Sequence, residues 1–260
     1  MLPFALLFVA GLGIGTLGTL IGAGGGWMIV PFLLFGLGFT HQRAVGTSLS
    51  VVFLNALSGS IAYMIQKRVL YRMGAAFAAA TIPGAIIGAI LVRYLGSQRF
   101  VLLFAVFLSF LSVLLLKGRT VTGRSCRHPS MEELNSLCSP IMLAGMFLSF
   151  LVGVISSLFG IGGGIVHVPF LIVMLGMEVH SATATSHFVL AVTSLVGTLI
   201  FLYNGDVDLS VMGAMGAGVL LGAQAGAILS KKMPSDPIRK TLAFAVFVFA
   251  VGLIFRHILG

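Results

Sequence analysis

Long runs of apolar residues, separated by short polar gaps, cover almost the whole chain. An α-helix rises about 1.5 Å per residue, so about 20 apolar residues cross the hydrocarbon core of a bilayer. Runs of this kind recur along the sequence, and the longest polar stretch lies at about 118–139. The apolar segments lie at about 3–21, 27–38, 44–65, 73–92, 99–117, 141–159, 165–176, 182–203, 209–230 and 238–256. The pattern predicts an all-α integral membrane protein with ten membrane segments.

Composition narrows the class of protein further. Charged residues make up 8% of the 260 residues and hydrophobic residues 58%, whereas soluble domains carry about 25% charged residues. This excludes a soluble enzyme, a nucleic-acid-binding module and a disordered protein. The net charge of +9 comes from basic residues in the gaps between apolar segments, which is typical of membrane orientation rather than of nucleic-acid binding. We interpret the first apolar segment as a membrane span and not as a cleaved signal peptide, because no basic residues precede it.

The second half of the sequence repeats the first. An offset of 138 positions takes the cluster Gly22-Ala23-Gly24-Gly25-Gly26 to Gly160-Ile161-Gly162-Gly163-Gly164. The same offset, without a gap, takes Val30-Pro31-Phe32-Leu33 to Val168-Pro169-Phe170-Leu171 and Thr47-Ser48 to Thr185-Ser186. The sequence therefore predicts a first transmembrane repeat at 1–117, a polar cytoplasmic linker at 118–139 and a second transmembrane repeat at 140–260.

The distribution of basic residues predicts how the two repeats are oriented. If every segment crosses the membrane, the halves have opposite orientations, and 11 of the 15 Lys and Arg residues lie on one side. If segment 27–38 and its copy only dip into the membrane, the halves are parallel and the division is 8 to 7. The positive-inside rule favours the inverted repeat. It places both termini outside and the linker, with Cys126 and Cys138, in the reducing cytosol. Segment 27–38, at about 18 Å if helical, is expected to be part of a broken element.

The two glycine clusters are the first candidate for a binding site. Exposed backbone within a membrane is tolerated only where it is buried in protein or lines a watery cavity. The N terminus of the following helix carries partial positive charge and free N–H groups, which bind anions. Tight helix packing by small residues is the alternative. If two inverted copies direct two helix ends to one site, its backbone contacts are Gly24, Gly25, Gly26, Gly162, Gly163 and Gly164.

Polar side chains inside the apolar segments are the second candidate. Thr47 and Ser48 recur as Thr185 and Ser186, and Asn55 lies about two helical turns after Ser48, on the same face. Hydroxyl groups that only bond their own helix are the alternative. These five residues are candidate substrate contacts.

Three aromatic side chains complete the set of candidates. His167 and His187 lie in apolar stretches, where a histidine must face protein or water. Each is either a neutral ring satisfied by a neighbour or an anion donor or proton carrier. Trp27 follows the first cluster directly and either lines the site or anchors the helix at the membrane interface. All six acidic residues fall in loops or at segment ends, so an uncharged path is expected, which suits an anion better than a cation.

The duplicated motif resembles a known family. The repeated Gly-x-Gly-Gly-Gly followed by Val-Pro-Phe-Leu, with Val45-Gly46-Thr47-Ser48-Leu49 downstream, is similar to the TauE/SafE sulfite exporter family, also called the toluene-sulfonate uptake permease family. The resemblance covers essentially the whole chain. It implies a multi-pass permease of the prokaryotic inner membrane for sulfur-containing anions such as sulfite, taurine and sulfoacetate. It also implies that the glycine, threonine and serine positions of both motifs lie near the translocation path. The second half departs from the pattern, with Ala184 where the first has Gly46 and His187 where it has Leu49, so an asymmetric site is compatible with it.

The expected function is therefore secondary transport of a small sulfur-containing anion by alternating access. A passive anion channel and a membrane subunit of a larger transport complex are the alternatives. We expect no enzymatic activity, no cofactor and no metal site, because neither a catalytic set nor a His/Cys metal spacing is visible. Coupling to protons, coupling to Na⁺ and a homodimer all stay open. The other expected partner is membrane lipid, and nucleic acid is not expected.

Overall fold

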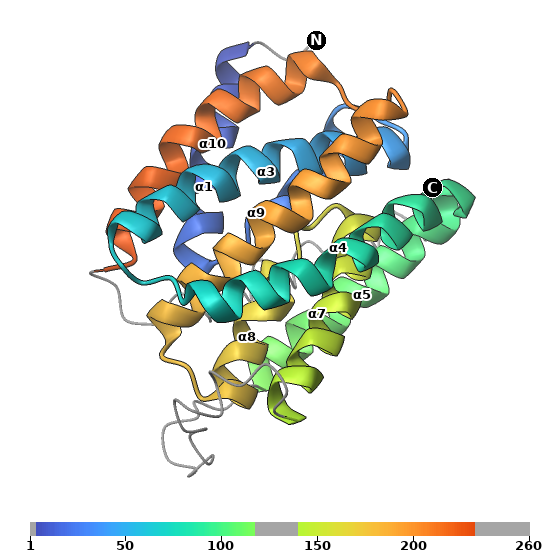
Figure 1. Ribbon diagram of the computed structural model, residues 1–260. Helices are drawn as coiled ribbons and strands as arrows, with labels where there is room; N and C mark the ends of the chain where they lie inside the picture. Colours follow the sequence, from blue (N-terminus) through green and yellow to red (C-terminus); the bar gives the residue numbers. More distant parts are fainter. Residues whose placement is uncertain (1–3, 118–139, 232–260) are drawn as a thin grey trace.

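The computed structural model describes residues 4–117 and 140–231, and helices dominate both parts (Figure 1). The all-α prediction is confirmed for these residues, in which no strand occurs. The first part holds α1 (Phe4–Ile21), α2 (Gly26–Pro31), the π-helix η1 (Phe32–Gly36), α3 (His41–Ile65), α4 (Tyr71–Tyr94) and α5 (Ser97–Lys117). The second part holds α7 (Pro140–Phe159), α8 (Gly164–Leu175), α9 (Val179–Tyr203) and α10 (Leu209–Leu229).

Six of the described helices are long and apolar enough to cross a membrane, namely α1, α3, α4, α7, α9 and α10. Their outer surfaces carry large apolar side chains, such as Phe4, Phe147 and Leu221, which are 65%, 65% and 59% exposed. Such a surface is stable in hydrocarbon and not in water. The protein is a multi-pass membrane protein. The predicted tenth segment, 238–256, and the linker with its two cysteines lie outside the described residues.

The predicted short segments differ between the two halves. Residues 26–36 form a short α-helix that continues as a π-helix directly after Pro31. Proline has no N–H group for the helical ladder, and a widened turn is one way to absorb the defect. The matching residues 164–175 stay α-helical through Pro169. The sequence does not distinguish these two outcomes, since both prolines stand five residues after the last glycine.

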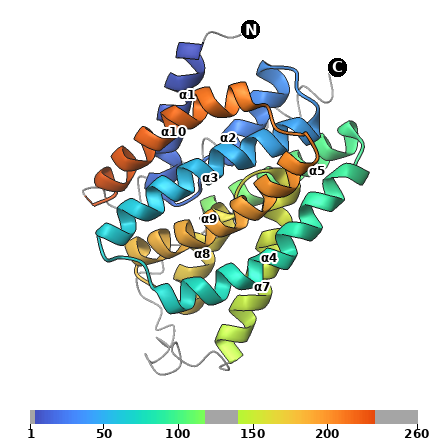
Figure 2. The ribbon, with the colours of Figure 1, turned by 45° about the horizontal axis from the view of Figure 1, so that its top comes forward.

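Helices from the two halves alternate in space. α3 and α9 pack against each other in the middle, α1 lies along α10, and α4 lies along α7 (Figures 1 and 2). α5 joins the α7 side through Phe100, Phe104 and Phe107, whose rings lie 5.9, 5.5 and 5.2 Å from the ring of Phe159. Neither half therefore forms a separate bundle.

The central helices α3 and α9 run in opposite directions. The Oγ1 atom of Thr47, near the start of α3, accepts a hydrogen bond of 2.9 Å from the amide of Asp208, which follows α9. The Oγ1 atom of Thr185, near the start of α9, accepts one of 3.2 Å from the amide of Leu70, which follows α3. Each helix thus begins where the other ends, as the ribbon also shows (Figure 1).

Close contacts between the outer helices depend on glycine. A Cβ added at Gly222 of α10 would lie 2.9 Å from the amide nitrogen of Thr16 in α1. A Cβ at Gly84 of α4 would lie 3.0 Å from the amide nitrogen of Val154 in α7. Both distances leave no room for a side chain, so these glycines let the helix backbones approach each other. The two contacts obey the 138-position offset, because Gly84 corresponds to Gly222 and Thr16 to Val154.

Candidate functional site

Both glycine clusters form tight turns in left-handed backbone conformation. Gly24 and Gly25 have φ angles of +75° and +84°, and their counterparts Gly162 and Gly163 have +82° and +76°. Only glycine adopts such angles without a steric cost. The first turn joins α1 to α2 and the second joins α7 to α8, and all of these glycines are buried. The residue type is therefore dictated by the backbone at both turns.

The two turns pack directly against each other. Gly26 approaches the backbone of Gly160 and Ile161, and Gly164 approaches the backbone of Gly22 and Ala23, where any side chain would collide. These contacts are reciprocal under the 138-position offset. The structure thus brings together in one place two motifs that are far apart in the sequence.

Two apolar side chains lie against both turns. A Cβ at Gly24 would lie 2.5 Å from Leu190 Cδ2 and 3.1 Å from Val52 Cγ1. A Cβ at Gly162 would lie 2.6 Å from Leu190 Cδ1 and 2.6 Å from Val52 Cγ1. Val52 on α3 and Leu190 on α9 are themselves related by the offset. Val52 and Leu190 thus pack against both glycine turns at once.

The helices behind the turns begin without side-chain caps. Gly25 precedes α2 and Gly163 precedes α8, and neither helix has a side-chain acceptor at its N terminus. Buried helix ends of this kind leave amide donors without partners. At the first turn, the amides of Gly22, Ala23 and Gly24 do bond back to carbonyls of α1, at 3.0, 2.8 and 3.1 Å. Backbone N–H groups that could bind a ligand are therefore expected at the first residues of α2 and α8, and not at the beginning of the turn.

A buried polar network adjoins the first turn. The Thr19 hydroxyl lies 3.2 Å from Asn55 Oδ1 and 3.3 Å from His187 Nε2. The Asn55 amide group donates to the Gly24 carbonyl at 3.2 Å, and the Tyr63 hydroxyl donates to the Thr19 carbonyl at 2.8 Å. The ring of Tyr63 meets the imidazole of His187 edge to face at 5.7 Å. Three helices, α1, α3 and α9, thus join uncharged polar groups to the glycine turn.

The predicted hydroxyl groups have different surroundings. Thr47 and Thr185 bind the loops before α10 and α4, as described above. Ser48 donates to the carbonyl of Gly160 in the second turn at 2.7 Å. The hydroxyl of its counterpart Ser186 is fully buried and has no hydrogen-bond partner among the described residues. Of these four hydroxyl groups, only that of Ser186 therefore has no hydrogen-bond partner among the described residues.

His167 and Trp27 lie apart from this network. His167 pairs with the Ser149 hydroxyl at 2.9 Å and contacts the rings of Phe77 and Phe170, at 5.7 and 5.9 Å. Trp27 is buried in an apolar cluster with residues such as Phe104 and Phe159. The side-chain partners of His167 are thus different from those of Asn55 and His187.

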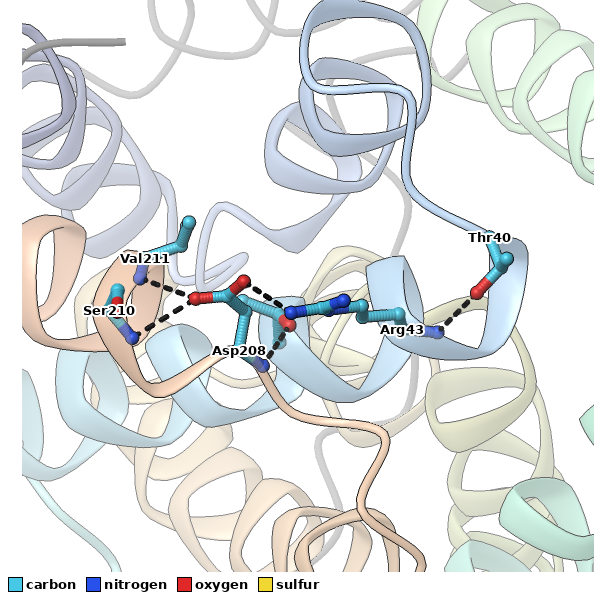
Figure 3. A network of polar contacts seen from close by, with 6 residues as sticks. Thr40, Arg43, Asp208, Ser210 and Val211 are labelled. Carbon is cyan, nitrogen blue, oxygen red and sulfur yellow. Dashed lines mark hydrogen bonds and ion pairs between the residues drawn. The ribbon is translucent and has the colours of Figure 1, made fainter. Parts of the chain in front are cut away.

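An ion pair fastens one end of the central helices. Arg43 of α3 lies 2.7 Å from the carboxylate of Asp208, which also accepts hydrogen bonds of 3.0 Å from the amides of Ser210 and Val211 at the start of α10 (Figure 3). Thr40 caps α3 beside it (Figure 3). Under the 138-position offset, Ser181 corresponds to Arg43 and Leu70 corresponds to Asp208. Neither Ser181 nor Leu70 is charged, so these two residues cannot form an equivalent ion pair.

Thr19, Gly59 and Tyr63 contact the candidate residues Asn55 and His187 or their network, but the sequence did not predict them as site residues. A Cβ at Gly59 would lie 2.6 Å from Cδ2 and 2.8 Å from Nε2 of His187, so this glycine provides the space for the imidazole. Nothing in the local pattern marks these residues, because their partners are up to 168 positions away. The 138-position offset pairs Gly59 with Gly197, yet only the fold shows which side chains those glycines face.

Comparison with known proteins agrees with the motif. The family model described as "Sulfite exporter TauE/SafE" matches residues 7–253. The chain belongs to the TauE/SafE family. It is 31% identical over 273 residues to the "Probable membrane transporter protein YunE" of Bacillus subtilis (strain 168), covering 99% of both chains. No solved structure is significantly similar to the chain.

More distant relatives extend the TauE/SafE comparison. The "Probable membrane transporter protein MJ0441" of Methanocaldococcus jannaschii is 28% identical over 269 residues, which cover 98% of this chain and 96% of that one. "Sulfite exporter TauE/SafE family protein 5" of Arabidopsis thaliana is 34% identical over 128 residues, covering 48% of this chain and 27% of that one. These names agree with the resemblance seen in the sequence. They do not identify the substrate of this chain.

Proposed function

We propose that the protein is a secondary transporter that moves a small sulfur-containing anion, such as sulfite or an organosulfonate, across the prokaryotic cytoplasmic membrane. Membership of the TauE/SafE family and relatives named as membrane transporters support the class of activity. The family description supports the choice of cargo. The direction of transport is left to experiment.

The observation that carries the proposal is the meeting of the two glycine turns inside the protein. Two helices begin there without side-chain caps, and the adjoining network of Thr19, Asn55 and Tyr63 is uncharged. Amide donors and neutral hydrogen-bonding groups stabilise an anion in an apolar interior without holding a permanent counter-charge. A cation would find few acceptors at the helix starts.

Alternating access by an inverted repeat is the proposed mechanism. The opposite directions of α3 and α9 and the reciprocal contacts of the two turns support this symmetry. Because Val52 and Leu190 fill the space between the turns, substrate would enter only when the two repeats move apart on one side. Rocking of one repeat against the other would then expose the same site to either face of the membrane.

Within this proposal the candidate residues take different roles. We assign direct contact with the anion to the backbone of both turns and to the side chains of Ser48, Asn55, Ser186 and His187. Thr47 and Thr185 would position the loops that move with the repeats. Trp27 in α2 and His167 in α8 would hold these short helices against their neighbours, since Trp27 is buried in an apolar cluster and His167 contacts Ser149 and Phe77.

A thermal-shift panel on the purified protein tests the substrate class. A ligand that binds only the folded state raises its stability by about 2.7 kcal/mol at a concentration of 100 Kd. We expect sulfite or the sulfonate isethionate to raise the melting temperature in a saturable way, with acetate and chloride as controls. Equal shifts by all anions, or none by the sulfur compounds, would contradict the proposal.

Flux measurements separate this transporter from the two alternatives. A carrier saturates with substrate, whereas a passive channel follows the electrochemical gradient without saturation at low concentration. A subunit of a larger complex would transport nothing when reconstituted alone and would co-purify with a partner ATPase.

A further inference from the structure

The two glycine turns have unequal surroundings, although their backbones match. The network residues of the first turn are Thr19, Asn55, Tyr63 and His187. Under the 138-position offset their counterparts are Ser157, Thr193, Phe201 and Leu49. Thr193 bonds Thr81 and its own helix, and the Ser157 hydroxyl has no partner among the described residues. Among the described residues, the network of the first turn is therefore not repeated by the corresponding residues at the second turn, where the titratable group is His167, paired with Ser149.

Hydrogen bonding determines which nitrogen of His187 carries the proton. Asn55 uses its NH₂ group for the Gly24 carbonyl, so its Oδ1 atom faces Thr19 and can only accept. The single hydroxyl proton of Thr19 must therefore go to Asn55. His187 Nε2, at 3.3 Å from the same hydroxyl, must then be the donor, and Nε2 carries the proton of the neutral ring.

This assignment leaves Nδ1 of His187 with a lone pair and no donor. The ring is fully buried, and no donor among the described residues reaches Nδ1. The backbone of Gly22, in the first turn, also lies close enough to form a hydrogen bond with the ring, and its carbonyl can only accept. A buried acceptor without a partner is costly. It is also the position at which a proton can be added without breaking any bond of the network, because Nε2 keeps its contact with Thr19.

The charged and titratable groups near the ring do not balance an added proton. Tyr63 on α3 meets the ring edge to face, and the guanidinium of Arg68 lies 5.7 Å from the centre of the Tyr63 ring. α1 brings Thr19, and the sequences of α1 and α10 contain no charged residue. The two arginines of α4 are exposed, and the titratable group of α8, His167, pairs with Ser149. An imidazolium here would thus be a buried cation without a counter-ion.

We propose that His187 is the proton site of the transporter, and that its Nδ1 atom takes up one proton together with each substrate anion. The inference rests on the proposed anion transport. A lone anion and a lone imidazolium are each strongly disfavoured in a dry interior, whereas the pair is neutral. The proton enters the Nδ1 lone pair from the side that supplies the anion and donates to an anion oxygen. Both leave on the other side, and the neutral ring returns.

Proteoliposomes loaded with a pH-sensitive dye test this coupling with the wild-type protein. The probes are radiolabelled sulfite and radiolabelled isethionate, and isethionate is a strong-acid anion that carries no proton itself. We expect isethionate entry to acidify the lumen. A proton gradient should drive accumulation of about tenfold for each pH unit, because one pH unit is equivalent to about 1.36 kcal/mol. A membrane potential should have little effect, since a proton and a monoanion together carry no charge.

The outcomes separate this inference from the proposed function. If folded wild-type protein takes up neither probe, the proposed function fails and the coupling fails with it. If uptake occurs without acidification, or follows a Na⁺ gradient or the membrane potential, the proton site is wrong while anion transport stands.

Variants locate the coupling at the proposed residue. His187→Gln should lose acidification of the lumen and the response to a pH gradient. The anion exchange that remains should be weaker than in the wild-type protein, because one side chain that contacts the anion is changed. His41→Gln is the matched control. Like His187, His41 is buried and pairs with a hydroxyl group, that of Ser97 at 3.0 Å, but it lies outside the site. Gly59→Ala keeps the histidine but displaces its ring, and should weaken coupling more than Gly197→Ala in the other repeat. Normal coupling in His187→Gln, or its loss in His41→Gln alone, would overturn the assignment.

Discussion

At the scale of single residues, the glycine turns combine a backbone requirement with a packing requirement. Gly163 has a positive φ angle, and a Cβ there would also lie 2.7 Å from Val152 Cγ1 and 3.2 Å from Ser156 Cβ. Gly205, in the loop between α9 and α10, has nearly the same φ angle, +75°, with nothing within 4 Å of an added Cβ. A substitution at Gly205 therefore tests backbone strain alone, whereas one at Gly163 tests backbone strain and steric crowding together.

Alanine at these two glycines should have unequal effects. Gly205→Ala should cost about 1 kcal/mol of stability, which is the price of the left-handed conformation. Gly163→Ala should cost about 1–3 kcal/mol more because of overpacking, and should also abolish anion uptake. Thermal unfolding followed by the fluorescence of Trp27, the single tryptophan, measures the first effect and liposome uptake the second. Wild-type uptake by a folded Gly163→Ala variant would show that the turn is not the site.

Some site residues could be predicted from the sequence, and the reason is physical. Asn55 and His187 stand out because an amide or an imidazole is costly in an apolar segment unless it has a partner. Thr19 does not stand out, because a threonine can satisfy its hydroxyl within its own helix. Its bonds to Asn55 and His187 depend on how three helices meet. The pair Arg43 and Asp208 was equally hidden, since charges 165 positions apart in the sequence have no local signature.

At the scale of helices, glycines divide α10 into a packed face and an open one. Gly222 faces the backbone of α1, with Thr16 at 2.9 Å from an added Cβ, whereas Gly213 has nothing within 4 Å. Glycine in a helix costs about 0.5–1 kcal/mol relative to alanine when nothing else changes. The same substitution should therefore have opposite signs at the two positions.

Melting temperatures of Gly213→Ala and Gly222→Ala test this contrast. Gly213→Ala should raise stability by about 0.5–1 kcal/mol. Gly222→Ala should lower it by about 1–3 kcal/mol, because the collision is with the backbone of a neighbouring helix and cannot be relieved by a rotamer change. Equal effects of the two variants would mean that α1 and α10 do not pack as described.

The start of α10 depends on Asp208 in two ways, as helix cap and as ion-pair partner. Asparagine also caps helices well, so Asp208→Asn should remove mainly the ion pair, worth about 0–1 kcal/mol for an exposed arginine. Asp208→Ala should cost about 1 kcal/mol more, because the cap is lost as well. A double-mutant cycle with Arg43→Gln isolates the ion pair. No difference between the Asn and Ala variants would contradict the capping role.

The hydropathy pattern predicted the positions of the long helices well, but it did not predict which short helix contains a π-helical turn. The predicted segments 73–92 and 182–203 correspond to α4 at 71–94 and α9 at 179–203. Apolar length determines these boundaries because the bilayer requires it. The π-helix after Pro31 was not predicted, since the same proline position in α8 leaves the α-helix intact. The position of the proline alone therefore does not decide between the two forms.

At the scale of the whole molecule, the opposite directions of α3 and α9 predict the membrane topology. The loop that follows α3 contains Lys67, and the loop that follows α9 contains Gly205. If the halves are inverted, these two loops lie on opposite sides of the membrane. If the halves are parallel, the same loops lie on one side.

Cysteine labelling distinguishes these topologies. In a background in which Cys126 and Cys138 are replaced by serine, Gly205→Cys should react with a membrane-impermeant maleimide in intact cells. Lys67→Cys should react only after the membrane is permeabilised, in accord with the positive-inside rule. Labelling of both positions in intact cells, or of neither, would contradict the inverted repeat.

The central claim is that this TauE/SafE family member carries small sulfur-containing anions through the place where its two glycine turns meet. Uptake of radiolabelled sulfite and isethionate by proteoliposomes that contain only the purified protein tests it most directly. The proposed function predicts saturable uptake of at least one of these anions, competed by the other and absent in Gly163→Ala. Folded wild-type protein that takes up neither anion, or flux that rises without saturation, would contradict it.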